Sequence, residues 1–363
     1  MLKYVSLAML GFVTACATGP GEFPDDPNLI TVTAAVETVP VKTKDDAADD
    51  PAIWVHPTNS AKSLILGTDK KAGLYSYNLQ GEVVHFLPLA APNNVDLRQN
   101  IPTQVEAMTI NQGTSQTVTT ETVDIAVTSN RDNNTIGILS VTEEGTDLLT
   151  EIPTARPEPY GICMGYEQGR IGQILVAVTH KSGNVDLYII DLEQGALGQY
   201  GFSVDSQPEG CVFDEANGTL YVGEEAKGIH AFQLEDLYRQ RATSTLVDDV
   251  AGPNGITADI EGLTIYQTGE TSGYLIASSQ GNHSYAIYDR ESRAFLGRFA
   301  VVPGETIDGA QETDGLDATS ARLGPNFPNG VLVVQDGYNR PRKPQNFKVI
   351  SWDAISEALN LSP

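Results

Sequence analysis

The sequence is poor in cysteine and in basic residues, and both shortages narrow the range of possible functions. Three cysteines among 363 residues cannot form a disulfide-dense scaffold. The 22 lysines and arginines are outnumbered by 47 aspartates and glutamates, which gives a formal net charge of −25. Because the phosphate backbone of nucleic acids selects basic surfaces, we expect no nucleic-acid partner. An anionic ligand would need bound metal ions or a local cluster of basic side chains.

Apolar segments long enough to span a membrane are also missing, and the best candidate for such a segment lies at the N-terminus. Lys3 precedes an apolar stretch at residues 4–13, which is shorter than the roughly 20 apolar residues of a membrane-spanning helix. This arrangement is typical of a secretory signal, and Val13-Thr14-Ala15-Cys16 resembles a bacterial lipoprotein cleavage site. An ordinary signal peptide with an incidental cysteine is the alternative.

The lipoprotein interpretation divides the N-terminal region into two parts. We expect a signal peptide at residues 1–15 and a flexible tether, rich in Gly, Pro and acidic residues, at residues 16–28. A lipid on Cys16 would be the only membrane attachment. The protein would then be exported and anchored at the bacterial envelope, in the outer membrane, the periplasm or at the cell surface.

One pattern recurs through the rest of the chain. A short run of apolar residues is followed by a small polar turn and by a second run of alternating polarity. The runs are rich in Val, Ile, Tyr and Thr, which predicts β-strands. Six such runs begin 46 to 61 residues apart, a period typical of propeller blades, at Leu64, Ile125, Ile174, Leu220, Leu275 and Leu332.

Each of these runs is preceded by one short strand and followed by two more, so that the repeating unit has four strands. The sequence therefore predicts an all-β fold, a six-bladed β-propeller with four-stranded antiparallel blades, in one domain over residues 29–363. Residues 29–39 alternate in polarity and could complete the last blade. Helix is expected only at residues 351–361, with Ser351 as the N-cap. A β-sandwich with accidental spacing is the alternative.

The predicted topology places many polar residues at one mouth of the central channel. Because the strands of a blade are antiparallel, the start of the first strand and the turn between the second and third strands share a face. The turns of the first three blades carry basic residues: Lys70, Lys71, Arg131, His180 and Lys181. Acidic or amide residues occupy the other turns and the strand openings: Asp49, Asp50, Glu209, Glu225, Asp259, Glu261, Gln280, Asp314 and Asp336.

The acidic half of this mouth predicts a site for hard cations. Ca²⁺ takes six to eight oxygen ligands, whereas zinc prefers His and Cys, which do not cluster here. Two carboxylates about 4 Å apart repel each other by about 4 kcal/mol at an effective dielectric near 20, so several bound ions would relieve the crowding. The basic half suits phosphate oxygens. A ligand that contacts both halves should be a phosphate ester, which metal-assisted hydrolysis could cleave.

Other phosphatase chemistries lack their motifs. Cys163 and Arg170 have six residues between them, one too many for a cysteine phosphatase, and neither an Arg-His-Gly motif nor a Gly-rich phosphate loop occurs. Two other functions stay open. A metal-dependent propeller lactonase would share the carboxylates but would not need the basic half. A non-catalytic surface lipoprotein would bind calcium and inositol phosphates without cleaving them.

Several segments resemble the β-propeller phytase family, in order and at compatible spacing from about Leu29 onward. The longest are residues 49–57, 70–74 and 259–266, and shorter ones lie at residues 129–131, 160–161, 278–282, 313–315 and 345–348. The family consists of calcium-dependent six-bladed propellers that hydrolyse phytate, myo-inositol hexakisphosphate, to lower inositol phosphates and phosphate. The resemblance therefore implies an enzyme of the 3-phytase type with several calcium ions as cofactors.

The resemblance also implies roles for individual residues. Ligands of the catalytic calcium ions would be Asp49, Glu209, Glu225, Asp259, Glu261 and Asp314. The residues that bind and polarise the scissile phosphate would be Lys70, Arg131, Tyr160 and Lys181. Structural calcium sites would include Glu37, Asp336 and Asn346. We add Asp50 to the metal ligands, and Lys71, His180 and Gln280 to the substrate-binding residues. Ser182 departs from the family pattern, in which Glu follows the lysine, and could alter the neighbouring phosphate subsite.

Charge accounts for the form of the substrate. Six phosphate monoesters carry roughly −9 to −12 in total, and this acidic chain could accept them only as a calcium complex. We expect a monomer in which a calcium-bound water attacks phosphorus in line, Lys70 and Arg131 stabilise the developing charge, and no covalent phosphoenzyme forms.

Two cysteines remain to be placed. Cys163 and Cys211 follow Tyr160 and Glu209 closely in neighbouring blades. A disulfide and a pair of buried thiols are both compatible with this placement, and the thiols are favoured.

Overall fold

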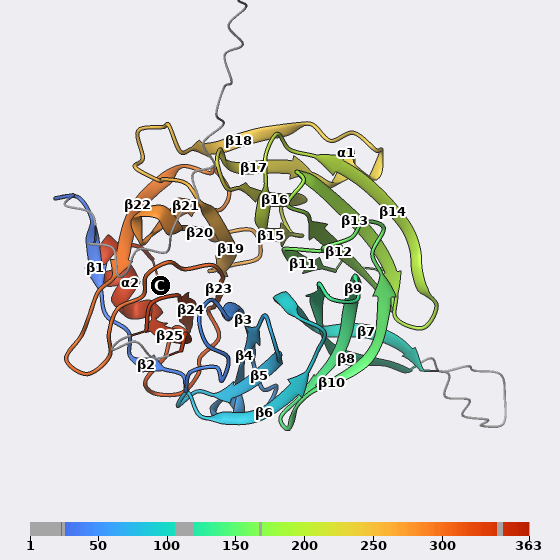
Figure 1. The fold of residues 1–363 in the computed structure, drawn as a ribbon, viewed down its shortest axis with the longest axis horizontal. Coiled ribbons are helices and arrows are strands. Elements are labelled where there is room, and N and C mark those ends of the chain that lie inside the picture. The colour runs from blue at the N-terminus through green and yellow to red at the C-terminus, as the bar shows by residue number, and fades with distance from the viewer. Residues whose placement is uncertain (1–22, 24–25, 106–118, 167–168, 340–343, 363) are drawn as a thin grey trace, which may run out of the picture.

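The computed structural model describes residue 23 and residues 26–105, 119–166, 169–339 and 344–362. These residues form a ring of six sheets around a central channel (Figure 1), which confirms the predicted six-bladed β-propeller. The predicted signal peptide and Cys16 lie outside the described residues. None of the helices in the described part of the chain has the length and apolar character needed to cross a membrane.

The blades follow one another in chain order, and the first strand of each blade lies nearest the axis. Blades 1 and 2 consist of β3 (Ala48–Trp54), β4 (Leu64–Asp69), β5 (Gly73–Asn78) and β6 (Val83–Pro88), and of β7 (Pro92–Val105), β8 (Thr119–Asn130), β9 (Thr135–Thr142) and β10 (Gly145–Pro153). Blades 3 and 4 consist of β11 (Ile162–Gly165), β12 (Gln173–Thr179), β13 (Asn184–Asp191) and β14 (Gly195–Ser203), and of β15 (Pro208–Asp214), β16 (Thr219–Glu224), β17 (Gly228–Gln233) and β18 (Ser244–Asp249).

The last two blades incorporate the N-terminal strands. Blade 5 contains β19 (Ile260–Gln267), β20 (Gly273–Ser279), β21 (Ser284–Asp289), β22 (Phe295–Val301) and β1 (Ile30–Val32). Blade 6 contains β23 (Leu316–Thr319), β24 (Val331–Asp336), β25 (Asn346–Ser351) and β2 (Val36–Glu37). As predicted, β2 completes the last blade by antiparallel pairing with β25. The preceding strand β1 instead pairs in parallel with β22 and gives blade 5 a fifth strand, so the N-terminal segment joins two blades.

The hydrophobic core lies between the blades. Both faces of each sheet are apolar, and a cluster of buried side chains fills each gap between neighbouring blades. Between blades 1 and 2, for example, Leu64 and Leu66 of β4 pack in one cluster with Leu97 of β7 and Leu139 of β9. Apolar residues on both faces of a sheet are buried only when a neighbouring blade covers each face. This packing therefore holds the six blades in a closed ring and sets the position of each first strand.

The helical prediction was partly right. Helix α2 (Trp352–Leu359) follows β25, but Ser351 makes no side-chain hydrogen bond as its N-cap. Trp352 stacks on Tyr266 with 3.6 Å between ring centres, which fastens the helix to blade 5. The short helix α1 (Leu234–Tyr238) after β17, and the 3₁₀ turns η1 (Ser60–Lys62) and η2 (Gln280–Asn282), were not predicted.

The favoured prediction of two free thiols was wrong. Cys163 of β11 and Cys211 of β15 form a disulfide. Although 48 residues separate them in the chain, their Cα atoms lie 5.6 Å apart because β11 and β15 are neighbouring first strands. The bond therefore links blades 3 and 4 close to the channel.

The end of the predicted tether contacts blade 5. The Phe23 ring centre lies 6.1 Å from that of His283, and Arg298 donates a hydrogen bond of 2.6 Å to Asp26. These contacts place the start of the propeller's N-terminal segment beside the turn that contains η2.

Candidate active site

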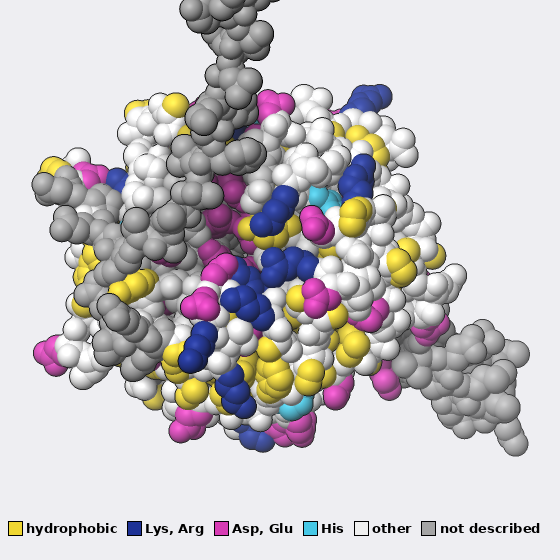
Figure 2. All heavy atoms as spheres, viewed as in Figure 1, with side chains coloured by type: hydrophobic (Ala, Val, Ile, Leu, Met, Phe, Trp, Pro, Cys, Tyr) yellow, Lys and Arg dark blue, Asp and Glu magenta, His cyan; other side chains and the backbone are white. Residues whose placement is uncertain are grey.

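The charged residues predicted at one mouth of the channel are neighbours in the structure. Acidic and basic side chains meet near the centre of the disc in Figure 2. The ammonium group of Lys70 lies 2.8 Å from Asp49 and 3.4 Å from Asp314, and Arg131 donates to the Lys70 carbonyl at 3.1 Å. Residues from the blade openings and from the basic turns therefore form one site, which we call the mouth site.

Glycines allow the blade openings to crowd around the axis. A Cβ atom on Gly161, which follows Tyr160, would lie 2.0 Å from the Glu209 carbonyl oxygen, and one on Gly210 would lie 2.0 Å from that of Glu261. No side chain fits at such distances. These two glycines therefore let neighbouring first strands approach closely, so the residues just before them project into the same small volume.

Three carboxylates form the centre of the acidic half. Oxygen atoms of Glu209, Glu225 and Glu261 all lie within 4.8 Å of one another. Glu209 and Glu261 are buried, and Oε2 of Glu261 has no hydrogen-bond partner among the described residues. Burial and the proximity of Glu209 raise the pKa of Glu225 to about 7 and raise that of Glu261 well above its usual value. The same causes raise the pKa of Asp259.

Lys70 connects the acidic half to the basic half. Burial raises the pKa of Asp49 to about 6 even though Lys70 opposes the shift, and it raises that of Asp314 well above the usual value. Burial alone would lower the pKa of Lys70, but Asp49 and Asp314 raise it, so this lysine is a permanent cation. Gln280 donates a hydrogen bond of 2.6 Å to Asp314, which places Gln280 in the mouth site as predicted.

Tyr160 and Lys181 lie where the two halves meet. The Lys181 ammonium group is 4.2 Å from the centre of the Tyr160 ring. Burial raises the pKa of the Tyr160 phenol, and Glu209 and Glu261 raise it further. The phenol therefore stays protonated and available as a hydrogen-bond donor.

Two residues of the mouth site were missed at the level of sequence. Asn93, fully buried, donates through Nδ2 to Asp49 at 3.0 Å and to Glu209 at 2.9 Å, and its Oδ1 has no partner among the described residues. Asn93 opens the second blade, so its position carried a signal. Asp46, 2.7 Å from the Lys70 ammonium group and 71% exposed, lies in a loop and carried none.

Two of the predicted substrate-binding residues do not reach the mouth site. His180 is buried, with its ring 3.2 Å from Asp186 and from the Pro157 carbonyl, so it cannot present its ring to a substrate there. Lys71 is exposed and donates to the Lys44 carbonyl at 3.1 Å, away from the carboxylates.

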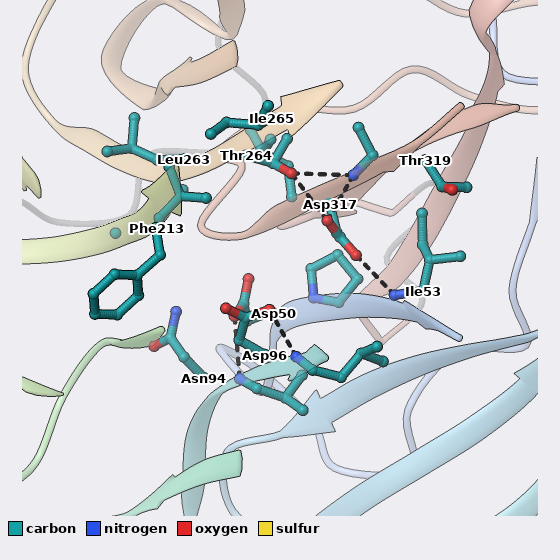
Figure 3. A pocket seen from close by; sticks show the side chains of 18 of the residues that line it. Asp50, Ile53, Asn94, Asp96, Phe213, Leu263, Thr264, Ile265, Asp317 and Thr319 are labelled. Carbon is teal, nitrogen blue, oxygen red and sulfur yellow. Dashed lines mark hydrogen bonds between the residues drawn. The ribbon is translucent and has the colours of Figure 1, made fainter. Parts of the chain in front are cut away.

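Asp50 faces a different part of the channel from Asp49. It accepts a hydrogen bond of 3.1 Å from the Val95 amide and lines a cavity of about 410 Å³, together with Asp96 and Asp317 (Figure 3). Consecutive residues of a strand point to opposite sides, which explains why Asp50 does not join the carboxylates of the mouth site.

The residues predicted for a structural calcium site also come together, but around a lysine. Asn346 donates to Glu37 at 3.2 Å. The fully buried ammonium group of Lys348 lies 2.7 Å from Glu37, 2.5 Å from Asp308 and 3.2 Å from Asp336. Oδ1 of Asn346 is buried without a partner among the described residues. Part of the negative charge here is therefore neutralised by Lys348 rather than left for a cation.

Comparisons with known proteins agree with the resemblance of the sequence segments. The model of a family described as Phytase matches residues 4–363. The chain is 37% identical over 379 residues to a 3-phytase of Bacillus subtilis (strain 168), an alignment that covers all of this chain and 94% of the relative. A solved structure titled "Crystal Structure of Mitotic Checkpoint Complex" matches 92% of this chain and 82% of its own, with 10% identity and a TM-score of 0.46. That likeness is too weak to bear on fold or function. The match of the family model and the full-length relative show that the chain belongs to the phytase family.

Proposed function

We propose that this protein is a calcium-dependent phytase of the 3-phytase type, a phosphoric monoester hydrolase that releases phosphate from phytate and leaves lower inositol phosphates. One observation carries the proposal beyond family membership. Lys70 lies directly beside the carboxylates of Asp49 and Asp314. Arg131 donates to the Lys70 carbonyl, and Lys181 lies over the ring of Tyr160, a residue close enough to Glu209 for that carboxylate to raise its pKa. The three basic residues come from three different blades. A phosphate ester is the ligand that can use both kinds of group at once.

The acidic half has the ligand atoms that calcium requires. Glu209, Glu225 and Glu261 offer converging oxygens, and the unpartnered Oε2 of buried Glu261 leaves one of them free for a cation. Asp49, Asp259 and Asp314 add further carboxylates with raised pKa values. Nitrogen and sulfur ligands are lacking in this cluster of described residues, which favours calcium over zinc. Bound calcium would neutralise these carboxylates and activate water for hydrolysis.

The side chains of the basic half would bind and orient the scissile phosphate. Lys70 supplies a compact charge and Arg131 a planar fork for its non-bridging oxygens, and the protonated Tyr160 phenol donates a hydrogen bond beside them. The oxygen of a water molecule attacks phosphorus in line while the ester P–O bond breaks. One proton of the water stays on the released phosphate, and the other ends on the inositol oxygen, which leaves as a hydroxyl group. Lys70, Arg131 and Lys181 stabilise the negative charge that the phosphoryl oxygens carry during this step.

Phosphate release from phytate tests the function directly. The protein is treated with a chelator and assayed with and without added calcium, and we expect turnover only with calcium. Activity that a chelator leaves unchanged would contradict the metal dependence. Binding of phytate in calcium without phosphate release over hours would instead support the non-catalytic lipoprotein. Lactone hydrolysis that Lys70→Ala leaves unchanged would favour the lactonase, because that enzyme would not need the basic half.

The proposals about processing, lipid attachment and location rest on the sequence. We propose that residues 1–15 are removed, that Cys16 carries a lipid at the bacterial envelope, and that the propeller acts as a monomer on the calcium complex of phytate. Metabolic labelling with a fatty acid should mark the wild-type protein but not Cys16→Ser. Equal labelling of the two proteins would remove the lipid anchor from the proposal.

A further inference from the structure

A buried polar residue directly precedes each basic residue of the mouth site. The three pairs are Asp69-Lys70, Asn130-Arg131 and His180-Lys181, and the first residue of each pair is at most 2% exposed. Each buried side chain has a partner in a neighbouring segment: Asp69 accepts from the Thr43 amide at 3.3 Å, Asn130 donates to Glu151 at 3.0 Å, and His180 lies 3.2 Å from the Pro157 carbonyl. Because burial of a polar group is costly unless it is hydrogen-bonded, such side chains fix the segments that they join.

His180 joins two segments of blade 3. Its Nδ1 atom donates to the Pro157 carbonyl, since a carbonyl oxygen can only accept, and its Nε2 atom lies 3.2 Å from Oδ2 of Asp186. Asp186 is fully buried in β13 and also accepts a hydrogen bond from the guanidinium group of Arg156. Burial would raise the pKa of Asp186, but His180 and Arg156 hold it below its usual value, so the carboxylate is ionised. We call Arg156, His180 and Asp186 the His180 network.

The neighbouring strand leaves room for the His180 network. Gly201 of β14 pairs with Asp186 of β13. A Cβ atom on Gly201 would lie 2.8 Å from Oδ1 of Asp186 and 3.2 Å from the Arg156 guanidinium group. A side chain there would therefore displace the arginine or the carboxylate, whereas glycine lets the partly exposed Arg156 reach the buried acid.

The His180 network connects the segments that carry Lys181 and Tyr160. Lys181 lies beyond the end of β12, in a turn that the backbone of His180 closes with two hydrogen bonds of 2.9 Å, to Gly183 and Asn184. The arginine of the network, and the carbonyl group that accepts from the histidine ring, belong to the segment that leads to Tyr160. One buried ring thus links the turn of the lysine to the segment of the tyrosine over which that lysine lies.

We propose that His180, held by Asp186 and Arg156, is a positioning residue for hydrolysis: it keeps the Lys181 ammonium group over the Tyr160 ring and thereby beside the scissile phosphate. The histidine ring is buried away from the substrate, so its effect passes through Lys181. A buried ionic contact contributes little more stability than apolar side chains of similar volume, so we assign the network to the placement of the turn. This inference rests on the proposed function and adds positioning residues to its site.

Substitution of His180 with and without Lys181 tests the proposal. For His180→Leu we expect kcat for phytate to fall about tenfold while KM changes less than about twofold, because the lysine is displaced from the reacting phosphate in the transition state. In a Lys181→Met protein the same substitution should change kcat by less than about twofold, since the group that it positions is absent. An equal fall in both backgrounds would overturn the proposal, because a purely structural residue acts independently of Lys181.

Two milder substitutions support the same test. His180→Asn keeps a donor near the position of Nδ1, as Asn130 does before Arg131, and should recover most of the lost kcat. A loss equal to that of His180→Leu would count against the proposal. Arg156→Gln removes the partly exposed end of the network and should lower kcat about threefold, again only when Lys181 is present. It decides the proposal if His180→Leu does not fold, and an equal effect in the Lys181→Met protein would overturn it.

The position of Lys181 can also be observed without an activity assay. The lysines are dimethylated with isotope-labelled formaldehyde, and the resonance that is missing from Lys181→Met identifies Lys181 in NMR spectra. The Tyr160 ring should shift this resonance upfield, and His180→Leu should remove the shift. An unchanged shift would overturn the proposal. If the wild-type protein released no phosphate, the proposed function would fail, but this measurement would still decide the positioning.

His56→Leu is the matched control. The His56 ring also lies beside a carboxylate, 3.1 Å from Glu143, but it follows β3 at the end of blade 1 opposite to the mouth site. We expect its kcat, its KM and its Lys181 resonance to equal those of the wild-type protein. A loss of kcat similar to that of His180→Leu would show that disturbing either histidine slows the enzyme, and it would overturn the proposal.

Discussion

The ammonium group of Lys181 lies over the ring of Tyr160, 4.2 Å from its centre. Lys181 comes from the turn between β12 and β13, and Tyr160 opens the same blade just before β11. A cation over an aromatic ring is attracted by the electrons of its face. The contact holds an exposed lysine beside a phenol whose other neighbours are Glu209 and Glu261, and so it fixes where the basic and acidic halves of the mouth site meet.

Removal of the Lys181 charge should impair catalysis more than folding. Lys181→Met keeps a long side chain but lacks the ammonium group, and we expect kcat/KM for phytate to fall about 100-fold. Because Lys181 is exposed, the free energy of unfolding should change by no more than about 1 kcal/mol. Lys181→Arg, which keeps the charge over the ring, should recover part of the activity. Full activity of Lys181→Met in steady-state assays would exclude a role for the charge.

Lys70→Ala should lower turnover and should also make stability depend strongly on calcium. The substitution leaves buried Asp49 and partly buried Asp314 without their cation, which costs about 3 kcal/mol when no metal replaces it. Calcium should restore most of this loss, because it neutralises the same carboxylates, but it should not restore turnover. Urea unfolding in chelator and in calcium, with a parallel phosphate-release assay, checks both statements. An equal loss of turnover and stability that calcium does not relieve would mean that Lys70 is only structural.

The raised pKa values predict an unusual dependence of stability on pH. Without metal, the folded protein holds protons on Asp49 up to about pH 6 and on Glu225 up to about pH 7, whereas the unfolded chain loses them near pH 4. The free energy of unfolding in chelator should therefore fall as the pH rises from about 4 to 7. Calcium binds the ionised carboxylates, so it should stabilise the protein more at pH 8 than at pH 5. Melting temperatures measured at both pH values, with and without calcium, check this prediction. The same rise with calcium at pH 5 and at pH 8 would contradict it.

The disulfide between blades 3 and 4 should contribute substantially to stability. It closes a loop of 48 residues, for which restriction of the unfolded chain predicts about 4 kcal/mol. Cys163→Ala/Cys211→Ala should lose this amount in urea unfolding, and a reductant that reaches the bond should bring the wild-type protein to a similar stability. The double variant serves as the control, because the reductant should not affect it. Wild-type stability in the double variant would show that packing alone holds these strands.

Asn93 should keep the carboxylates of Asp49 and Glu209 together without adding charge, because it donates a hydrogen bond to each. Asn93→Ala removes the donor shared by Asp49 and Glu209 and should destabilise the protein by about 1–3 kcal/mol. Asn93→Asp places a third carboxylate there, so its stability loss should be larger in chelator and largely recovered in calcium. Unfolding experiments in both conditions compare the two variants. The same response to calcium in both would show that Asn93 does not control the charge of the site.

The repeat and the alternating direction of the strands within it could be deduced from the sequence because both are local properties. The six apolar runs became β4, β8, β12, β16, β20 and β24, the second strand of every blade. Their spacing and antiparallel order placed Lys70, Arg131 and Lys181 at the same mouth as Glu209 and Asp314. Strand alternation and turn position depend on a few neighbouring residues, so no knowledge of distant contacts was needed.

The contacts across the channel were decided by the tertiary structure alone. How far Glu209 lies from Glu261, or Cys163 from Cys211, depends on how closely two blades pack, which glycines such as Gly210 permit only once the ring has closed. The sequence gives no measure of that approach. Nor does it show that Asp50 faces the cavity while Asp49 faces Lys70, or that Lys348 occupies the space between Glu37 and Asp336. Residue types and their order thus determined the fold and the kind of chemistry, whereas packing between blades determined which charges meet.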